Sequence, residues 1–188
     1  MRIIAGRFRS RALRAPNSSA VRPTSDRLRE TLFDVLTAGN PAALEGTVWL
    51  DLFAGSGAIG IEALSRGAQR VYFVESSRGA AAVIRENLKA LGVEEGYEVI
   101  EREADAALRR LGLAAAGCDY CFLDPPWRDA ESYGQVLGLL AQLRLLKPAS
   151  VVIAEHDKRF DPGAKFGALE RTRKLEQGDA ALSFYRLR

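Results

Sequence analysis

The sequence predicts an α/β fold: a doubly wound, mostly parallel sheet that ends in an antiparallel hairpin. Two observations favour it. Short β-branched or aromatic runs alternate with helical stretches over residues 48–155, which is typical of βαβ units with right-handed crossovers. The last two apolar runs are separated only by a short turn, Gln177-Gly178-Asp179, which indicates a hairpin. A chain of 188 residues suits one core of this kind.

The N-terminal segment predicts a small β-hairpin extension of this fold. Residues 2–5 and 11–14 favour two short strands around a turn. Residues 16–23 begin and end in proline, which restricts its own φ and the residue before it, so extended backbone is expected there. We therefore expect residues 1–23 to form a basic arm that precedes the main domain, residues 24–188.

The main domain opens with a helix. Thr24, Ser25 and Asp26 offer side chains that cap a helix N-terminus, and Gly39-Asn40-Pro41 ends the helical pattern. The parallel strands are expected at residues 48–53, 71–75, 97–101, 120–124 and 151–155. The helices between them are expected at residues 58–65, 79–91, 105–111 and 133–143, and the hairpin strands at residues 169–175 and 182–187.

Arginine is concentrated at the N-terminal end of the chain. Residues 1–30 hold eight arginines against two acidic residues, whereas the whole chain has a net charge of +3. Because the planar guanidinium group matches phosphate oxygens, this end predicts contact with nucleic acid. A solvated charged face and an arginine-rich transit peptide are the alternatives. The arginines expected to contact RNA are Arg2, Arg7, Arg9, Arg11, Arg22 and Arg27.

The composition excludes several classes of protein. No apolar run reaches the roughly 18–20 residues that cross a bilayer, so no membrane partner is expected. Two cysteines and one histidine are too few for a disulfide framework or a four-ligand zinc site, and no metal is expected. Cys118 and Cys121 are expected to pack in the core. The expected protein is a cytoplasmic monomer.

A glycine-rich segment, residues 51–60, predicts a cofactor site. It contains G-x-G-x-x-G between an expected strand and helix, and Glu75 follows Gly55 by twenty residues. Glycines let a nucleoside cofactor approach the backbone, and a carboxylate accepts from ribose hydroxyls; tight strand-to-helix packing is the alternative use. The expected cofactor-binding residues here are Asp51, Phe53, Ala54, Gly55, Ser56, Gly57, Gly60, Glu75 and Asp105.

The acidic residues of that set indicate which cofactor binds. Asp51, directly before the loop, would repel a diphosphate but suits the sulfonium and ammonium groups of S-adenosylmethionine. Asp105 follows the third expected strand, where it could accept from the adenine amino group or, equally, cap the next helix.

The segment Asp124-Pro125-Pro126-Trp127 predicts the catalytic residues. Two prolines donate no backbone N–H and stiffen the turn, so the Pro125 carbonyl faces outward as an acceptor beside the Asp124 carboxylate. Trp127 offers a flat surface on which a base can stack. Two acceptors on one exocyclic amino group localise its lone pair, which methyl transfer requires. A buried turn with a core tryptophan is the alternative.

These two motifs carry a resemblance to a known family. They resemble the cofactor loop and the D-P-P-[YFW] signature of class I S-adenosylmethionine-dependent amino-methyltransferases. Nearly the whole chain is similar, in order and spacing, to the bacterial 16S rRNA guanine-N2 methyltransferases of the RsmD type. The matching segments are residues 1–8, 22–30, 50–67, 73–75, 122–127, 155–156 and 183–185. Trp127 stands where tyrosine is more usual, which keeps the stacking surface but removes a hydroxyl.

The resemblance implies a Rossmann-like methyltransferase sheet and S-adenosyl-L-methionine as cofactor. It further implies transfer of the methyl group to the N2 amino group of one guanine in 16S rRNA, within an assembling 30S particle. Arg22, Thr24, Asp26 and Arg27 are then implied to lie near the cofactor and the RNA, which adds Thr24 to the cofactor-binding residues.

Two other functions stay open from the sequence. A DNA amino-methyltransferase acting on adenine N6 or cytosine N4 shares the pair of acceptors, although 188 residues leave little room for target recognition. An RNA-binding assembly factor without catalysis would keep the arginines but would not need Asp51, Glu75 and Asp124. His156, the only histidine, is expected to be structural or to contact RNA rather than to act as a general base.

Overall fold

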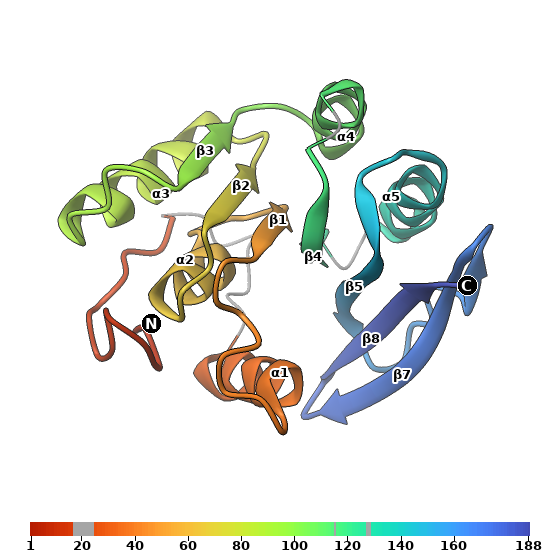
Figure 1. The fold of residues 1–188 in the computed structure, drawn as a ribbon, viewed down its shortest axis with the longest axis horizontal. Coiled ribbons are helices and arrows are strands. Elements are labelled where there is room, and N and C mark those ends of the chain that lie inside the picture. Colours follow the sequence, from red (N-terminus) through yellow and green to blue (C-terminus); the bar gives the residue numbers. More distant parts are fainter. Residues whose placement is uncertain (17–24, 115, 127–128) are drawn as a thin grey trace.

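A single mixed sheet forms the centre of the fold (Figure 1). The computed structural model describes residues 1–16, 25–114, 116–126 and 129–188. Its strands are β1 (Val48–Leu52), β2 (Arg70–Val74), β3 (Tyr97–Ile100), β4 (Cys118–Leu123), β5 (Leu146–Asp157), β6 (Lys165–Phe166), β7 (Leu169–Gln177) and β8 (Ala180–Leu187). Across the described sheet they lie in the order β3-β2-β1-β4-β5-β8-β7-β6. The first five are parallel and the last three antiparallel, which confirms the predicted fold class.

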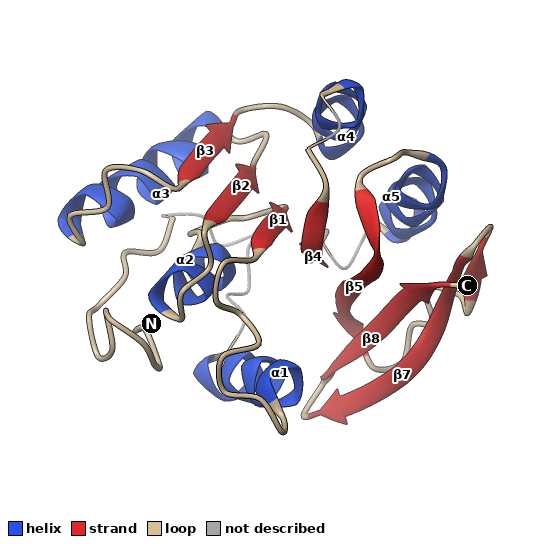
Figure 2. Cartoon of the chain, in the orientation of Figure 1, coloured by secondary structure: helices blue, strands red, loops and turns tan. Residues whose placement is uncertain are grey.

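Helices cover both faces of this sheet (Figure 2). They are α1 (Asp26–Thr37), α2 (Ala58–Ser65), α3 (Arg78–Ala90), α4 (Ala104–Leu113) and α5 (Ala130–Gln142). Buried side chains of α1, α2 and α3 share one hydrophobic cluster, and those of α4 and α5 share the other. All eight residues of α2 are buried, because this short helix lies between the sheet and the N-terminal segment.

The predicted boundaries differ most at β5. The sequence indicated residues 151–155, but the strand begins at Leu146 and includes an exposed proline, Pro148. A register shift next to Cys118 of β4 accommodates this extension. The Ser150 hydroxyl donates to the Cys118 carbonyl at 2.6 Å and accepts from the Lys147 N–H at 2.7 Å, so a side chain replaces regular ladder bonds here. The short β6 was not predicted.

The N-terminal hairpin is reduced to a single antiparallel bridge between Arg2 and Ala12. Across it the Ile3 N–H donates to the Arg11 carbonyl at 2.9 Å and the Leu13 N–H to the Met1 carbonyl at 3.1 Å, but the ladder does not extend further because the next N–H groups have other partners. Ile4 and Ala5 donate to the buried carboxylate of Glu62 on α2, at 2.8 and 3.0 Å. Of the expected extended segment, residues 17–23 lie outside the described residues.

Membrane-spanning helices, metal sites and cysteine chemistry were considered from the composition, and the described residues bear on each. No helix among them is long and apolar enough to span a bilayer. No group of three or more metal-ligating side chains is found among them. Both cysteines are free and buried, and burial raises the pKa of the Cys118 thiol to about 12. Neither thiol is therefore suited to redox chemistry.

The packing of Gly60 on the sheet makes the first prediction. A Cβ there would lie 2.3 Å from Cε1 of Phe73 and 2.7 Å from Cγ1 of Val71. We expect Gly60→Ala to lower the free energy of unfolding by about 1–3 kcal/mol, measured by urea denaturation. Gly134→Ala is the matched control, because a Cβ at that position of α5 meets nothing within 4 Å. The control should gain up to about 1 kcal/mol; equal stability of both variants would contradict this account.

Candidate active site

The parallel register brings the ends of four strands to one edge of the sheet. Leu52 of β1 pairs with Val74 of β2 on one side and with Leu123 of β4 on the other, and Leu123 pairs with Ala154 of β5. The residues that follow are therefore neighbours along the carboxyl edge. They include Phe53, Glu75, Asp124 and Glu155.

The loop after β1 depends on left-handed backbone at Phe53, Gly55 and Gly57, whose φ angles are 60°, 56° and 77°. A Cβ at Gly57 would lie 3.2–3.3 Å from Ile84 and Phe73, so this glycine is required for packing. A Cβ at Gly55 would meet only a backbone oxygen at 3.9 Å. Of the two uses weighed for these glycines, close packing therefore applies to Gly57, while Gly55 leaves its outer side open to a ligand.

Glu75 holds this loop in place. One oxygen of its carboxylate accepts from the Gly55 N–H at 2.8 Å, and the other accepts from the Ser77 N–H at 2.8 Å. Each oxygen keeps a lone pair for a further donor, since a carboxylate has about four acceptor positions. The predicted contact of Glu75 with ribose hydroxyls stays a prediction, and this geometry is compatible with it.

Carboxyl groups are concentrated at this edge of the sheet. Asp51 is 2% exposed, and its Oδ2 accepts from the Gly60 N–H at 2.9 Å. Burial and the nearby Glu75 raise the pKa of Asp51 to about 8. Burial, Glu155 and Asp51 together raise the pKa of Asp124 well above its usual range. The site therefore favours ligands that bring positive charge or N–H donors, which fits a sulfonium and an amino group.

The Asp124 turn (Asp124-Pro125-Pro126) follows β4 directly. Asp124 is half-buried, Pro125 is buried and Pro126 is exposed. The Pro126 carbonyl accepts from the Asp129 N–H at 2.7 Å, which leads the chain into α5. The turn thus lies at the carboxyl edge of the sheet, with Pro125 covered and Pro126 open to solvent.

His156 is structural. It is fully buried, its Nδ1 lies 2.8 Å from the Asp157 carbonyl and its Nε2 lies 2.9 Å from Oγ of Ser183. The carbonyl accepts only, so Nδ1 carries the proton and Nε2 accepts from the serine hydroxyl. Burial lowers the pKa of His156, which keeps the ring neutral. The contact with RNA weighed for His156 is wrong, because the ring has no exposed surface.

Asp105 lies in the first turn of α4 and is exposed. The capping use weighed for it is wrong, because the N-cap residue is Glu103, which makes no side-chain cap bond in the described structure. Its contact with adenine stays a prediction. Arg22, Thr24 and Trp127 lie outside the described residues, so their expected contacts with cofactor and base stay predictions as well.

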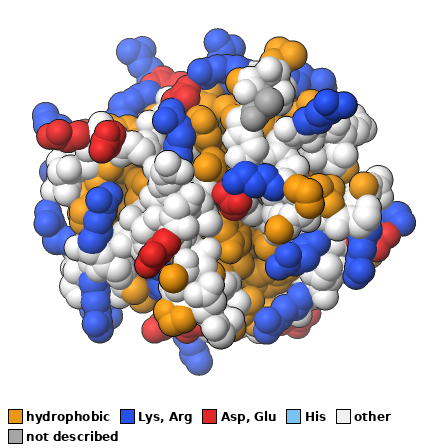
Figure 3. All heavy atoms as spheres, viewed as in Figure 1, with side chains coloured by type: hydrophobic (Ala, Val, Ile, Leu, Met, Phe, Trp, Pro, Cys, Tyr) orange, Lys and Arg blue, Asp and Glu red, His pale blue; other side chains and the backbone are white. Residues whose placement is uncertain are grey.

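The described arginines that were expected to contact RNA, namely Arg2, Arg7, Arg9, Arg11 and Arg27, are exposed but do not all lie together. Arg2, Arg9 and Arg27 line one groove of about 500 Å³ between the arm and α1. Arg11 instead donates to the Ala90 carbonyl at the end of α3, at 2.8 Å, and Arg7 lies over the Phe8 ring at 4.3 Å. On the face shown in Figure 3, Lys and Arg side chains are scattered over the surface and do not form one patch.

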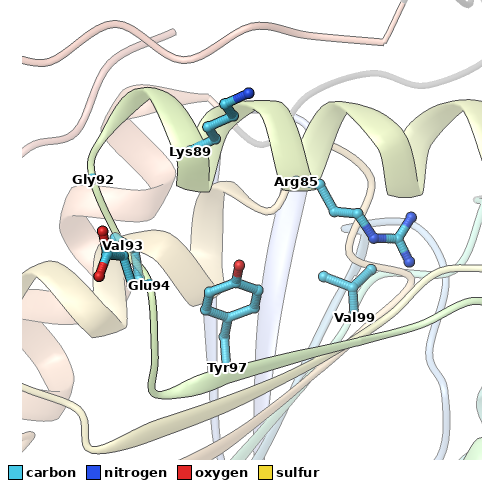
Figure 4. Close-up of a pocket in the computed structure, with 7 residues that line it drawn as sticks. All are labelled: Arg85, Lys89, Gly92, Val93, Glu94, Tyr97 and Val99. Atoms are coloured by element: carbon cyan, nitrogen blue, oxygen red, sulfur yellow. The ribbon is translucent and has the colours of Figure 1, made fainter.

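A second groove lies away from this edge, between α3 and β3. It measures about 550 Å³ and is lined by Arg85 and Lys89 of the helix and by Tyr97 of the strand, whose hydroxyl points toward the helix (Figure 4). None of its lining residues comes from the glycine loop or the Asp124 turn. This groove is therefore not part of the candidate site.

Sequence reasoning missed two residues that support the loop. Ser77 caps α3 and donates its N–H to Glu75. Asn87, buried in the middle of α3, donates to the Ser56 carbonyl at 3.0 Å. The available signal was an asparagine inside a helix, where this residue type is disfavoured unless its side chain has a particular use.

Comparison with known proteins agrees with this geometry. The family model described as "Conserved hypothetical protein 95" matches residues 1–186. The chain is 33% identical to the Bacillus subtilis "Putative rRNA methyltransferase YlbH" over 188 residues, all of both chains. It is 35% identical to the Haemophilus influenzae "Ribosomal RNA small subunit methyltransferase D" over 158 residues, 84% of this chain and 79% of that protein. The solved "Putative methyltransferase yhhF from Escherichia coli" aligns with a TM-score of 0.83 at 28% identity, over 100% of this chain and 97% of the other.

The sheet order, the glycine loop and the Asp124 turn define a protein with the Rossmann-like methyltransferase fold. The matches over the full length of the chain identify the family within this class of fold. The chain belongs to the "Conserved hypothetical protein 95" family, the family of the RsmD-type methyltransferases. This confirms the resemblance found in the sequence.

The raised pKa of Asp51 makes the second prediction. Its value of about 8 in the folded chain lies above the roughly 3.9 of an ordinary aspartate, so between about pH 4 and pH 8 the folded chain binds the extra proton. The contribution of Asp51 to the free energy of unfolding is therefore fully present at low pH. It is lost as the pH rises toward 8, by about 1.4 kcal/mol per pH unit. Asp51→Asn keeps an oxygen for the Gly60 N–H and removes the titration.

We expect the stability of Asp51→Asn to decline less than that of the wild type from pH 5 to pH 8, and the variant to be the more stable at pH 8. Urea unfolding at each pH measures this. Asp34→Asn, which changes an exposed aspartate of α1, is the control and should follow the wild type. Parallel pH profiles for Asp51→Asn and wild type would show that Asp51 titrates as an ordinary aspartate.

Proposed function

We propose that this protein is an S-adenosyl-L-methionine-dependent rRNA methyltransferase, and that it methylates the exocyclic N2 amino group of one guanine in 16S rRNA. The observation that carries the proposal is the placement of the Asp124 turn beside the glycine loop at one edge of the sheet. Membership of the RsmD-type family supports rRNA as the substrate.

The residues of the loop fit the cofactor. Gly55 is open on its outer side, and Glu75 is fixed with lone pairs to spare for ribose hydroxyls. The clustered carboxyl groups favour a positively charged ligand. The residues that would hold the cofactor are Asp51, Phe53, Ala54, Gly55, Ser56, Gly57, Gly60, Glu75, Asp105 and Thr24. When bound, S-adenosyl-L-methionine supplies an electrophilic methyl group.

Asp124 and Pro125 act on the amino group. The carboxylate of Asp124 and the carbonyl of Pro125 each accept one N–H of the guanine amine, which directs its nitrogen lone pair outward. Pro126 keeps the turn rigid because it has neither a free φ nor an N–H. Trp127 provides the surface on which the base stacks.

The environment of Asp124 also suits removal of the proton. The methylated amine loses one proton after transfer, to water or to Asp124. A carboxylate whose pKa is raised by burial and by Glu155 is a stronger proton acceptor than an ordinary aspartate. The ionised carboxylate of Asp124 thus first orients the amine and then accepts its proton.

The basic arm contacts the RNA in this proposal. The groove lined by Arg2, Arg9 and Arg27 offers three guanidinium groups to backbone phosphates beside the acidic Asp26 and Glu30, and Arg7, Arg11 and Arg22 add further contacts. Because the base must leave its stack to reach Asp124, the target is an unpaired guanine. The protein works in the cytoplasm as a monomer, on 16S rRNA within an assembling 30S particle.

Methyl transfer from labelled S-adenosyl-L-methionine tests this function. Purified protein is offered 16S rRNA, assembling 30S particles and duplex DNA in parallel, and the labelled nucleoside is identified after digestion. We expect N2-methylguanosine from the RNA samples only. Label in adenine or cytosine of the DNA would instead support a DNA amino-methyltransferase, and absence of cofactor binding would support an RNA-binding assembly factor.

Asp124→Ala should lose turnover in this assay by a factor on the order of 10²–10³, because one of the two acceptors for the amino group is removed. Its affinity for S-adenosyl-L-homocysteine, measured by calorimetry, should stay near that of the wild type. Asp34→Ala is the control, since that aspartate is exposed on α1. Full turnover by Asp124→Ala would refute the role proposed for this carboxylate.

The arm contributes a salt-dependent part of RNA affinity. Each phosphate contact contributes about −0.7 to −0.9 to the slope of log affinity against log salt. Arg9 lines the basic groove, so Arg9→Gln should make the slope shallower by about that amount, measured by fluorescence anisotropy with an rRNA fragment. Arg144→Gln, at an exposed position after α5, should leave the slope unchanged. An unaltered slope for Arg9→Gln would remove this groove from the RNA footprint.

A further inference from the structure

Asn87 connects two parts of the molecule that the proposed function uses separately. It lies within α3 and is 2% exposed. Asparagine is disfavoured inside helices because its side chain competes for backbone groups. A buried asparagine at this position therefore requires partners that offset the cost.

Those partners are backbone groups of the arm and of the glycine loop. Oδ1 of Asn87 accepts from the Arg14 N–H at 2.8 Å, and Nδ2 donates to the Arg14 carbonyl at 3.0 Å. The same Nδ2 donates its second hydrogen to the Ser56 carbonyl at 3.0 Å. Both amide hydrogens and one oxygen lone pair are thus used, which also determines the orientation of the amide group.

The loop residue concerned stands between the two loop glycines. Ser56 follows Gly55, whose N–H is held by Glu75, and precedes Gly57, which caps α2. A second contact joins the same two segments, since Oγ of Ser56 lies 3.8 Å from the sulfur of Met1. The arm is therefore attached to the loop at both its first residue and its fourteenth.

Other attachments of the arm do not reach the loop. Glu62 accepts from Ile4 and Ala5, and the Ser65 hydroxyl accepts from the Phe8 N–H at 3.0 Å and donates to the Ala5 carbonyl. These bonds hold the first turn of the arm on α2. Asn87 differs from them because one side-chain amide bonds to both segments at once.

We infer that Asn87 is a positioning residue that couples cofactor binding to RNA binding, so that each ligand increases affinity for the other. The inference rests on the proposed function. A ligand that orders the loop holds the Ser56 carbonyl and hence the Asn87 amide in the orientation that binds Arg14. The arm then presents its arginines at a smaller cost in conformational entropy, and by linkage RNA on the arm favours the ordered loop equally.

Two binding measurements test the coupling. The dissociation constant of an rRNA fragment is measured by anisotropy with and without saturating S-adenosyl-L-homocysteine. That of S-adenosyl-L-homocysteine is measured by calorimetry with and without the RNA. In the wild type we expect each ligand to tighten the other by the same factor, about fivefold or more. In Asn87→Asp, which keeps the acceptor for the Arg14 N–H but loses both donors, the factor should fall to about one.

Ser65→Ala is the matched control. It removes a buried side chain that holds the arm but does not contact the loop. RNA affinity should fall in this variant while the coupling factor stays at the wild-type value. A coupling factor of one in the wild type, or an undiminished factor in Asn87→Asp, would overturn the inference. Wild-type protein that binds neither ligand would instead contradict the proposed function itself.

Hydrogen exchange of the wild-type protein tests the same inference without any substitution, which matters if Asn87→Asp does not fold. S-adenosyl-L-homocysteine should slow exchange at the Arg14 amide, whose acceptor is Asn87. The Arg9 amide, which donates to Gly6 within the turn of the arm, should exchange at an unchanged rate. Unchanged exchange at Arg14 would show that the loop and the arm are independent.

Discussion

The parallel pairing of β1 with β4 is the constraint on which the rest of the site depends. It places Leu52 beside Leu123, so the glycine loop and the Asp124 turn leave the sheet at adjacent points. β1 is central and has neighbours on both sides, which also brings Glu75 of the β2 end to the loop backbone. Rigid strands thus position a loop and a turn that are more than sixty residues apart in the chain.

This arrangement concentrates negative charge in a poorly solvated place. Burial raises the pKa of Asp51 and of Asp124, and Glu155 adds to the effect on Asp124. Carboxyl groups arranged this way weaken the fold at neutral pH, because burial makes their ionisation costly in free energy. The same carboxyl groups favour binding of a sulfonium and of amino N–H groups. The chain therefore gives up a part of its stability for binding and chemistry.

The arm is attached by side chains and not by a β-ladder. Glu62, Ser65 and Asn87, all buried, supply partners for backbone groups of residues 4–14. Their polar groups are satisfied in part by the arm, and they hold the main chain of the arm in place. A basic segment held in this way keeps its arginine side chains outward while its main chain is fixed beside the loop.

The sequence by itself determined the class of fold, and it supplied the residues proposed for the site. Alternating apolar runs specify βαβ units wherever strands are buried on both faces, and α2 has the bounds that its pattern predicts. Tertiary structure decided what local patterns do not encode. Only folding showed that Gly57 packs while Gly55 stays open, that Asp105 does not cap its helix and that His156 is buried. The arm bonds to α2 and α3 as well as across its own short hairpin, because Glu62 and Asn87 are distant in sequence and become its hydrogen-bond partners only once the core has formed.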